Sequence, residues 1–288
     1  MRFYAETLGL SPNAFALLRD LIHERLGLFY DDGKQDLLAD KLSPLVIERG
    51  LDSFLDYYYL LKYDENAADE WRRVIDALSV QETYFWREMD QVHALVEEIT
   101  PAYFARRPAM PLRIWSAACA TGEEPLTIAM ALNEAGWLGR APIEIYATDI
   151  SPAAIAKAQA GIYRERSFRA LPEHLRKRYF VPWRPLERSE FEPAQWQVAP
   201  WLRALIRWDV VNLVSDKDVQ RMPTMHVIFC RNVFIYFSES SIRRTVRLFS
   251  QILVAPGYLF VGASESLLRL TADFELQEVG GAFVYVKR

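Results

Sequence analysis

The sequence predicts an α/β fold in which a small all-α domain precedes a parallel sheet. Apolar residues recur at helical spacing over about the first hundred residues. After Pro108, short apolar segments alternate with helical segments over short links, a pattern typical of a parallel sheet. Two further apolar segments flank Gly280-Gly281 and predict a terminal β-hairpin.

The helical domain is predicted from start and stop signals. Ser11 followed by Pro12 predicts the start of a helix that ends at Gly27, because serine caps helices and proline suits the first helical position. Helices are expected over residues 12–26, 37–47, 53–61, 66–80 and 89–104. We assign residues 1–80 to the helical domain and residues 81–108 to a linker and motif-bearing helix.

The remaining residues, 109–288, are assigned to the sheet domain. Strands are expected over residues 113–119, 143–149, 226–230, 257–262, 274–279 and 282–286, and helices over residues 123–135, 153–160 and 238–253. Between Tyr163 and Trp208 prolines and tryptophans accumulate and glycine is absent. This stretch predicts an insertion at about residues 164–207.

Composition limits the class of protein. With 51% hydrophobic and 25% charged residues among 288, the chain can bury a core. Its net charge of −4 excludes a globally basic nucleic-acid binder. Two cysteines are too few for a disulfide scaffold, and four scattered histidines predict no metal site. No signal peptide and no membrane-spanning segment are expected, so a soluble cytoplasmic protein is predicted.

A candidate ligand site lies where the first strand turns into a helix, at Ala117–Pro125. Ligands of parallel sheets bind outside the carboxyl ends of the strands, and a helix N-terminus offers free amides there. Gly122 is the only glycine in this segment, so it is not a dinucleotide fingerprint. The pattern fits a nucleotide-like site and a tight turn with acidic residues equally well.

Polar residues also end two later strands. Asp149 lies 25 residues beyond Glu124, where an acid can accept hydrogen bonds from ribose hydroxyls; the alternative is a simple helix entry. Asn232 and Tyr236 place polar atoms among apolar residues, where a ligand is one candidate partner and an aromatic core edge is the alternative.

The segment Ser79–Glu88 places three adjacent aromatic residues before Arg87. On physical grounds alone, the stronger interpretation is that the aromatic rings join two domains. Arg87 would then pair with Glu88 or Glu82.

Four segments together resemble, in order, the motifs of the CheR family of S-adenosylmethionine-dependent chemoreceptor glutamate O-methyltransferases. They are Thr83–Glu88, Ser116–Pro125, Ala147–Asp149 and Ile228–Phe237, and Gly262–Leu267 and Ala158–Tyr163 resemble two further family segments. The resemblance covers nearly the whole chain. It implies a class I methyltransferase domain of Rossmann-like fold after the helical domain. It also implies an inserted small β-subdomain, which some members use to grip a receptor tail.

The resemblance implies roles for single residues. Glu124 and Asp149 match acidic contacts to the amino-acid and ribose parts of the cofactor, and Asn212 matches a position near the adenosine. Thr83 and Arg87 match cofactor- and substrate-side positions, and Asn232 and Tyr236 match those nearest the sulfonium. The expected cofactor-binding residues are Gln81, Thr83, Arg87, Ala118, Glu124, Asp149, Asn212, Leu213, Asn232 and Tyr236, and the expected catalytic residues are Arg87 and Tyr236.

The chain departs from the family pattern at several positions. Gln81 stands where well-known members have asparagine, Trp86 replaces a more usual phenylalanine, and Leu126 replaces a more usual tyrosine. The insertion lacks the glycines expected of a tail-gripping subdomain, and no tetratricopeptide extension like that of some relatives is expected after Arg288.

The implied reaction is in-line attack of a glutamate carboxylate on the sulfonium methyl group, giving a methyl ester and S-adenosylhomocysteine. A surface glutamate with a pKa near ~4.3 is already ionised at neutral pH, so no general base is needed. Arg87 would orient this carboxylate, Tyr236 would place the methyl group, and Asp149 would hold the ribose.

The expected partner is the glutamate-bearing helical region of a methyl-accepting chemotaxis receptor in the cytoplasm. The chain is expected to be a monomer that binds no nucleic acid and does not insert into a membrane. Residues 161–190 hold eight basic and four acidic side chains, which would steer such a helix; a solvated face with scattered ion pairs is the alternative. Two other functions stay open. One is a non-catalytic cofactor-binding sensor or scaffold of a chemosensory array, and the other is a methyltransferase for nucleic acid or a small molecule.

Overall fold

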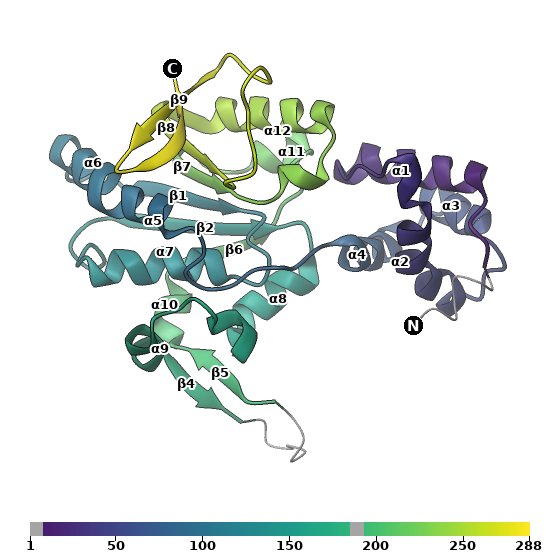
Figure 1. The fold of residues 1–288 in the computed structure, drawn as a ribbon, viewed down its shortest axis with the longest axis horizontal. Coiled ribbons are helices and arrows are strands. Elements are labelled where there is room, and N and C mark those ends of the chain that lie inside the picture. Colours follow the sequence, from purple (N-terminus) through teal and green to yellow (C-terminus); the bar gives the residue numbers. More distant parts are fainter. Residues whose placement is uncertain (1–7, 185–192) are drawn as a thin grey trace. The chain divides into compact units, whose positions relative to one another are not determined.

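The chain divides into two compact units, and the computed structural model describes residues 8–184 and 193–288 (Figure 1). The first unit contains Met1–Val80 and Tyr236–Ile242, and the second contains Gln81–Ile235 and Arg243–Arg288. Residues 1–7, where a signal peptide would begin, lie outside the described residues, as do Glu187, Arg188 and Glu190 of the predicted basic segment.

Four successive α-helices lie in residues 8–80. They are α1 (Pro12–Leu26), α2 (Gln35–Glu48), α3 (Phe54–Tyr63) and α4 (Ala67–Leu78), with the 3₁₀ turn η1 (Asp32–Lys34) before α2. The Ser11 side chain accepts a hydrogen bond from the Ala14 amide, and Gly27 has a left-handed φ of 77°. Both predicted ends of the first helix are therefore confirmed.

A buried carboxylate ties these helices together. Glu70 on α4 is fully buried and accepts hydrogen bonds from Tyr57 (2.7 Å) and Arg49 (2.6 Å). Arg73 adds an ion pair at 3.2 Å. Burial acts to raise the pKa of Glu70, but the hydrogen bonds from Tyr57 and Arg49, together with the charges of Arg73 and Arg49, outweigh it and lower that pKa. A carboxylate with all its partners in place favours a single arrangement of α2, α3 and α4.

The second unit is built on a seven-stranded sheet of order β6-β2-β1-β7-β8-β10-β9. Its strands are β1 (Leu112–Ala117), β2 (Ile143–Asp149), β6 (Ile206–Val210), β7 (Met225–Cys230), β8 (Leu253–Val261), β9 (Phe274–Val279) and β10 (Ala282–Lys287). The first five strands of this order are parallel, and the hairpin of β9 and β10 is antiparallel. The predicted parallel sheet and terminal hairpin are confirmed, and the carboxyl ends of the five parallel strands share one edge.

Strand β6 is missing from the sequence prediction, which extends the insertion to about residue 207. Ile206 pairs with Ile145 of β2 at the start of a five-residue parallel ladder. The end of the predicted insertion therefore belongs to the main sheet. Because Arg207, Asp209 and Val210 are exposed on this edge strand, the sequence lacks the apolar run of a central strand.

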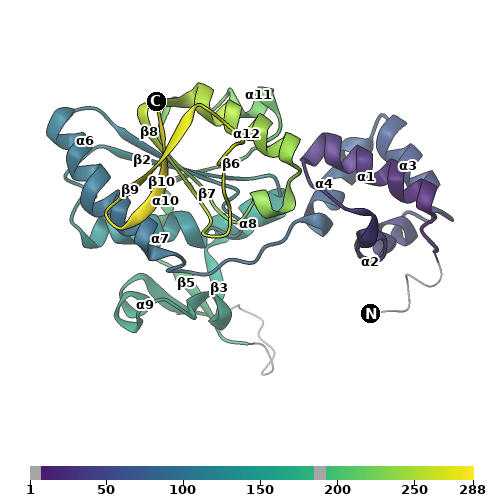
Figure 2. The same cartoon turned by 45° about the horizontal axis from the view of Figure 1, so that its top comes forward.

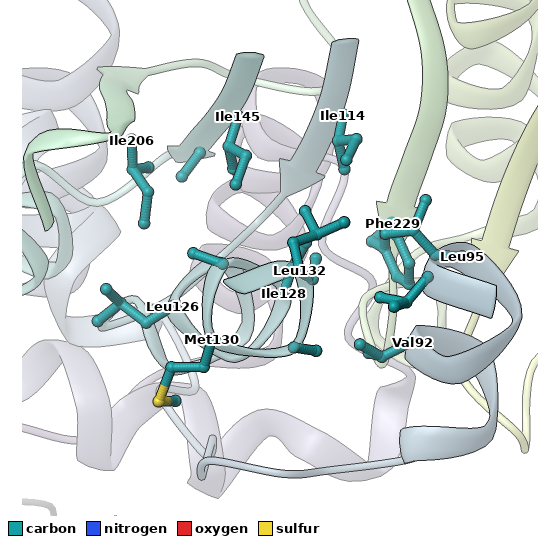
Figure 3. Packing of buried hydrophobic residues seen from close by; sticks show 14 of the residues in the cluster. Val92, Leu95, Ile114, Leu126, Ile128, Met130, Leu132, Ile145, Ile206 and Phe229 are labelled. Atoms are coloured by element: carbon teal, nitrogen blue, oxygen red, sulfur yellow. The ribbon is translucent and has the colours of Figure 1, made fainter. Parts of the chain in front are cut away.

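Helices cover both faces of the main sheet. They include α7 (Glu123–Glu134), which contacts β1 and β2, and α8 (Pro152–Ala160), which contacts β2 and β6. Two more are α11 (Asp216–Val219) and α12 (Glu239–Ile252). Neighbouring residues of β1 point to opposite faces. Ile114 joins the cluster around α7 (Figure 3), whereas the Trp115 ring packs 5.3 Å from the ring of Phe249 on α12.

Residues 89–106 form one helical segment of the second unit. It consists of α5 (Met89–His93), the π-helical η2 (Ala94–Ile99) and α6 (Thr100–Arg106). Val92 and Leu95 project from it into the core beside Phe229 (Figure 3). The Thr83–Glu88 motif precedes this helix instead of lying within it, because Trp86 and Glu88 have left-handed φ values of 70° and 49°.

The inserted segment forms a small antiparallel sheet of order β3-β5-β4. Its elements are β3 (Ile162–Arg164), η3 (Glu165–Phe168), α9 (Glu173–Tyr179), β4 (Phe180–Trp183), β5 (Gln195–Val198) and α10 (Pro200–Ala204). Figures 1 and 2 show it on the side of the main sheet that α7 covers. Asn133 of α7 donates a hydrogen bond to Tyr179 at 2.6 Å. The small inserted subdomain is therefore confirmed.

Within residues 8–184 and 193–288, no helix has the length and apolar character needed to cross a membrane. The same residues contain no group of three or more His, Cys, Asp or Glu side chains suited to a metal ion.

The free energy of unfolding should fall as the pH decreases from about 6.5 to about 4. Nδ1 of His226 on β7 accepts a hydrogen bond from the Arg113 amide at 3.0 Å, so the ring is held neutral. Burial, with the charges of Arg113 and Arg107, lowers the pKa of His226 from 6.5 to about 4. The unfolded chain takes up this proton at the higher pH, so stability present above 6.5 is lost towards 4.

Urea denaturation at about pH 7 and about pH 5 measures this loss. His226→Gln keeps an acceptor but cannot titrate, so the variant should lose less stability than the wild-type chain over that interval. Equal losses in the two proteins would contradict the assignment to His226.

Candidate functional site

The loop after β1 has an unusual backbone. Ala118, Ala120 and Gly122 have left-handed φ values of 60°, 48° and 95°. The two alanines carry a Cβ, so this conformation costs about 1 kcal/mol or more at each of them. The Cys119 amide anchors the loop on β2 by donating to the Thr148 carbonyl at 2.8 Å. Backbone strain of this kind clusters at ligand sites, which supports the candidate site at the carboxyl end of β1.

Gly122 allows this loop to pack closely. A Cβ at this position would lie 2.9 Å from Cβ of Ala158 on α8 and 3.0 Å from the ring of Trp208 on β6. Any larger residue would have to push one of these elements away, in addition to adopting a positive φ.

Asp149 fixes the same loop from the end of β2. Its carboxylate accepts hydrogen bonds from the amides of Ala120 and Ser151, both at 2.9 Å, and the residue is 8% exposed. The bond to Ser151 is the helix entry that the sequence offered as an alternative. The bond to Ala120 goes further, because it joins the carboxyl ends of β1 and β2.

Arg231 connects three segments at the end of β7. Its side chain is 3% exposed and donates to Oε2 of Glu124 on α7 at 2.6 Å. It also donates to the backbone carbonyls of Arg87 and Glu88, both at 3.1 Å. Oε1 of Glu124 accepts from the Ser116 hydroxyl at 2.6 Å. Through these bonds, Arg231 holds the motif before α5 against the ends of β1 and β7.

The side chain of Arg87 lies partly in solvent. It is 26% exposed, lies 3.6 Å from the Glu88 carboxylate, and donates to the Glu82 carbonyl at 3.2 Å. Its guanidinium lies 5.5 Å from the centre of the Tyr84 ring. The expected pairing with Glu88 is present. The neighbouring ring of Phe85 is fully buried inside the second unit, so it packs within one unit instead of joining two domains.

Four more of the predicted cofactor residues also lie in the second unit. Gln81 Oε1 is 3.4 Å from Nζ of Lys157 on α8, and Thr83 is half-buried. After β6, the side-chain oxygen of Asn212 accepts from the Val214 amide at 3.1 Å, and Leu213 is buried. Asn212 therefore shapes the turn that follows the strand.

Asn232 follows Arg231 with a left-handed φ of 60°. Asparagine tolerates this conformation better than most residues. Tyr236 is counted with the first unit, where its carbonyl accepts from the Phe29 amide at 2.8 Å and 37% of the residue is exposed. The structure thus places nine of the ten predicted cofactor residues in the second unit, and Tyr236 in the first.

Three further charged side chains join the loops of the site by hydrogen bonds, and the sequence analysis gave none of them a role. They are Arg231, Glu265 and Glu123. Arg231 directly follows Cys230, which ends a strand whose last residues are buried. A charge at such a place must have a partner, and that signal could have identified it. Glu265 and Glu123 carry no comparable signal, because their partners are backbone amides or hydroxyls of segments distant in the sequence.

Burial sets the protonation of the side chains near these loops. Glu123 accepts hydrogen bonds from Thr121 (2.7 Å) and Ser167 (3.0 Å), and burial raises its pKa. Burial also raises the pKa of Cys119 and Cys230 well above 9.0. Both thiols stay protonated at neutral pH, so they are not nucleophiles.

Two family models cover most of the chain. The CheR methyltransferase all-alpha domain matches residues 13–79, and the CheR methyltransferase SAM binding domain matches residues 81–281. The chain belongs to the CheR methyltransferase family. The resemblance stated from the sequence motifs is therefore confirmed, and the second unit is the S-adenosylmethionine-binding methyltransferase domain of that family.

Several CheR-family relatives are similar over nearly their full length. Chemotaxis protein methyltransferase 2 of Vibrio cholerae is 34% identical over 275 residues, which are 95% of this chain and 92% of the relative. The chemotaxis protein methyltransferase of Salmonella typhimurium is 34% identical over 94% of this chain and 90% of its own length. Chemotaxis protein methyltransferase 1 of Pseudomonas aeruginosa is 29% identical over 94% of this chain and 96% of its own length.

The residues of this chain fit S-adenosylmethionine. Asp149 ends β2, and Asn212 and Asn232 follow β6 and β7. The carboxyl ends of these three parallel strands share one edge, where nucleosides bind in such sheets. The left-handed loop from Ala118 to Gly122 brings backbone atoms to that edge without large side chains. These groups offer hydrogen-bonding partners for hydroxyl, amino and ring-nitrogen atoms.

Arg231→Met should lower the free energy of unfolding by about 3–5 kcal/mol, because it leaves the Glu124 carboxylate and two carbonyls without their buried partner. Urea denaturation of the full chain measures the change. Arg221→Met is the matched control, because Arg221 is 54% exposed and pairs with Asp218 at 3.7 Å. An exposed pair contributes about 0–1 kcal/mol. A loss for Arg231→Met no larger than that of the control would contradict the role of Arg231.

Proposed function

We propose that this chain transfers the methyl group of S-adenosylmethionine to glutamate side chains in the cytoplasmic part of a chemoreceptor. The products are glutamate methyl esters and S-adenosylhomocysteine. The observation that carries the proposal is the set of bonds from Arg231. They hold the backbone of the partly exposed Arg87 at the carboxyl end of β7, where Asn232 directly follows Arg231 in the chain. Family membership and the names of the relatives support the same activity.

The bound cofactor supplies an activated methyl group on a positively charged sulfur. The residues of this chain have to bind the cofactor, orient the acceptor glutamate and exclude water from the site. A glutamate with a pKa near ~4.3 is ionised at neutral pH, so the chain needs no base to activate it. Good alignment of two reacting groups is worth several kcal/mol, and we assign most of the catalysis to alignment.

We assign the alignment of the incoming carboxylate to Arg87. A guanidinium can donate two parallel hydrogen bonds to a carboxylate. The Glu88 carboxylate now lies 3.6 Å from Arg87, and a substrate carboxylate would compete with it. Tyr236 is proposed to place the methyl group.

We propose that Asp149 binds the ribose of the cofactor and that Glu124 binds its amino-acid part. Asn212 and Leu213 are proposed to contact the adenosine. Glu124 acts in part through Arg231, because both of its oxygens already accept hydrogen bonds. Gln81, Thr83, Ala118 and Asn232 are proposed to complete the cofactor site.

The partner is proposed to be a helix that carries glutamates. Of the basic side chains in residues 161–184, Arg176 pairs with Glu165 at 2.8 Å and Lys177 with Glu173 at 3.6 Å. Scattered ion pairs therefore account for part of this segment. Arg164 and Arg166 of β3 and η3 are exposed and would attract an acidic helix. We propose a cytoplasmic, monomeric protein.

One experiment separates this function from its alternatives. The full chain is mixed with methyl-labelled S-adenosylmethionine and a chemoreceptor cytoplasmic fragment, and the labelled product is treated with mild base. We expect the label to be released as volatile methanol, because carboxyl methyl esters hydrolyse. A base-stable product would indicate a nucleic acid or small-molecule substrate. Bound cofactor without transfer would indicate a non-catalytic sensor or scaffold.

Arg87→Ala should lower kcat by about 100-fold or more and change the affinity for S-adenosylhomocysteine by less than about threefold, because the proposed role is alignment of the acceptor. Methyl-ester formation and calorimetry measure the two effects. Arg107→Ala is the matched control, since Arg107 is also an exposed arginine over a tyrosine ring, at 5.9 Å from Tyr103. Unchanged turnover in Arg87→Ala would remove Arg87 from the mechanism.

A further inference from the structure

One carboxylate, that of Glu265, accepts hydrogen bonds from four backbone amides. Oε2 accepts from Asn232 at 2.8 Å and from Gly262 at 2.6 Å. Oε1 accepts from Phe234 at 2.7 Å and from Ile235 at 3.3 Å. Three of these amides belong to the loop after β7 and one to the loop after β8. Glu265 therefore joins the carboxyl ends of two neighbouring parallel strands.

Gly262 completes this arrangement. A Cβ at Gly262 would lie 2.6 Å from Nδ2 of Asn232 and 2.9 Å from its backbone nitrogen. The backbone of Gly262 thus packs directly against the Asn232 side chain. The Glu265 amide closes the turn by donating to the Gly262 carbonyl at 2.9 Å.

The bonds from Glu265 fix the conformation of Asn232. Asn232 has a φ of 60°, which leaves its amide turned towards the carboxylate and its side chain against Gly262. Without a strong acceptor, the amides of Asn232, Phe234 and Ile235 would have to find other partners, and the left-handed conformation would lose its support. Charge-assisted hydrogen bonds to a carboxylate are about twice as strong as neutral ones.

We infer that Glu265 is a positioning residue that acts through Asn232 and sets the geometry of the methyl-transfer site. The inference rests on the proposed role of Asn232 beside the sulfonium of the cofactor. Both carboxylate oxygens of Glu265 accept hydrogen bonds from backbone amides, so we assign it no contact with substrate. Its negative charge is directed at backbone amides, so its effect on the reaction depends on the side chain of Asn232.

The test is a double-mutant cycle in the full chain with Glu265→Gln and Asn232→Gly. Glutamine keeps one acceptor oxygen but turns an amino group towards the other amides. Glycine removes the Asn232 side chain and still accepts a positive φ. We expect Glu265→Gln to weaken S-adenosylhomocysteine binding by about threefold to tenfold and to lower kcat by about tenfold or more. Adding it to Asn232→Gly should cause little further loss of either quantity.

Independent effects, in which the losses of the two single variants multiply in the double variant, would overturn the inference. So would wild-type affinity and turnover in Glu265→Gln. Glu275→Gln is the matched control, because Glu275 is half exposed on β9 and pairs with Arg288 at 3.6 Å. It should behave like the wild-type chain in both measurements.

A second variant guards against loss of folding, which thermal unfolding detects. Glu265→Asp keeps the charge but shortens the side chain, so it should fold and lie between the wild-type chain and Glu265→Gln in affinity and kcat. A value no better than that of Glu265→Gln would contradict the inference.

If the wild-type chain methylates no receptor fragment, the proposed substrate fails. The affinity cycle still decides the role of Glu265, because it needs only S-adenosylhomocysteine.

Discussion

The buried ion pair between Arg231 and Glu124 is the interaction on which the candidate site depends. A guanidinium that is 3% exposed is costly unless every donor finds an acceptor. Here the acceptors come from α7 and from the Arg87 and Glu88 carbonyls. The requirement to satisfy one buried charge therefore brings together segments that lie more than a hundred residues apart. The same requirement places Arg87 next to the sheet.

Along this edge of the sheet, several carboxylates accept hydrogen bonds from backbone amides. Asp149 holds the loop after β1, and Glu265 holds the loops after β7 and β8. The loops after β1 and β7 contain non-glycine residues with positive φ, namely Ala118, Ala120 and Asn232. Such conformations persist only where the surroundings favour them strongly, and a carboxylate bound to several amides supplies that. The edge thus presents backbone and small side chains in defined positions, as a nucleoside cofactor requires.

Periodicity and caps predicted most of the fold correctly because they are local. Ser11, Gly27 and Gly280-Gly281 mark ends and turns through their own backbone preferences. Strand β6 escaped prediction since an edge strand has exposed residues and no continuous apolar run. The Thr83–Glu88 motif was expected on a helix, but Trp86 and Glu88 adopt left-handed conformations there. Tertiary contacts favour that backbone, because in this arrangement Arg231 donates hydrogen bonds to the carbonyls of Arg87 and Glu88.

The candidate site divides in the same way. The sequence by itself determined which strands carry polar residues at their carboxyl ends, since Asp149 and Asn232 lie at or just after the ends of largely apolar segments. It also determined the family, through motifs whose residues and order are specific. Only the tertiary structure decided that Glu124 pairs with Arg231, and that Glu265 accepts hydrogen bonds from four backbone amides of two loops. The physical reason is that a buried charge is satisfied by whichever groups the fold brings within hydrogen-bond distance. Those groups lie far away in the sequence, and many of them are backbone atoms that every residue possesses.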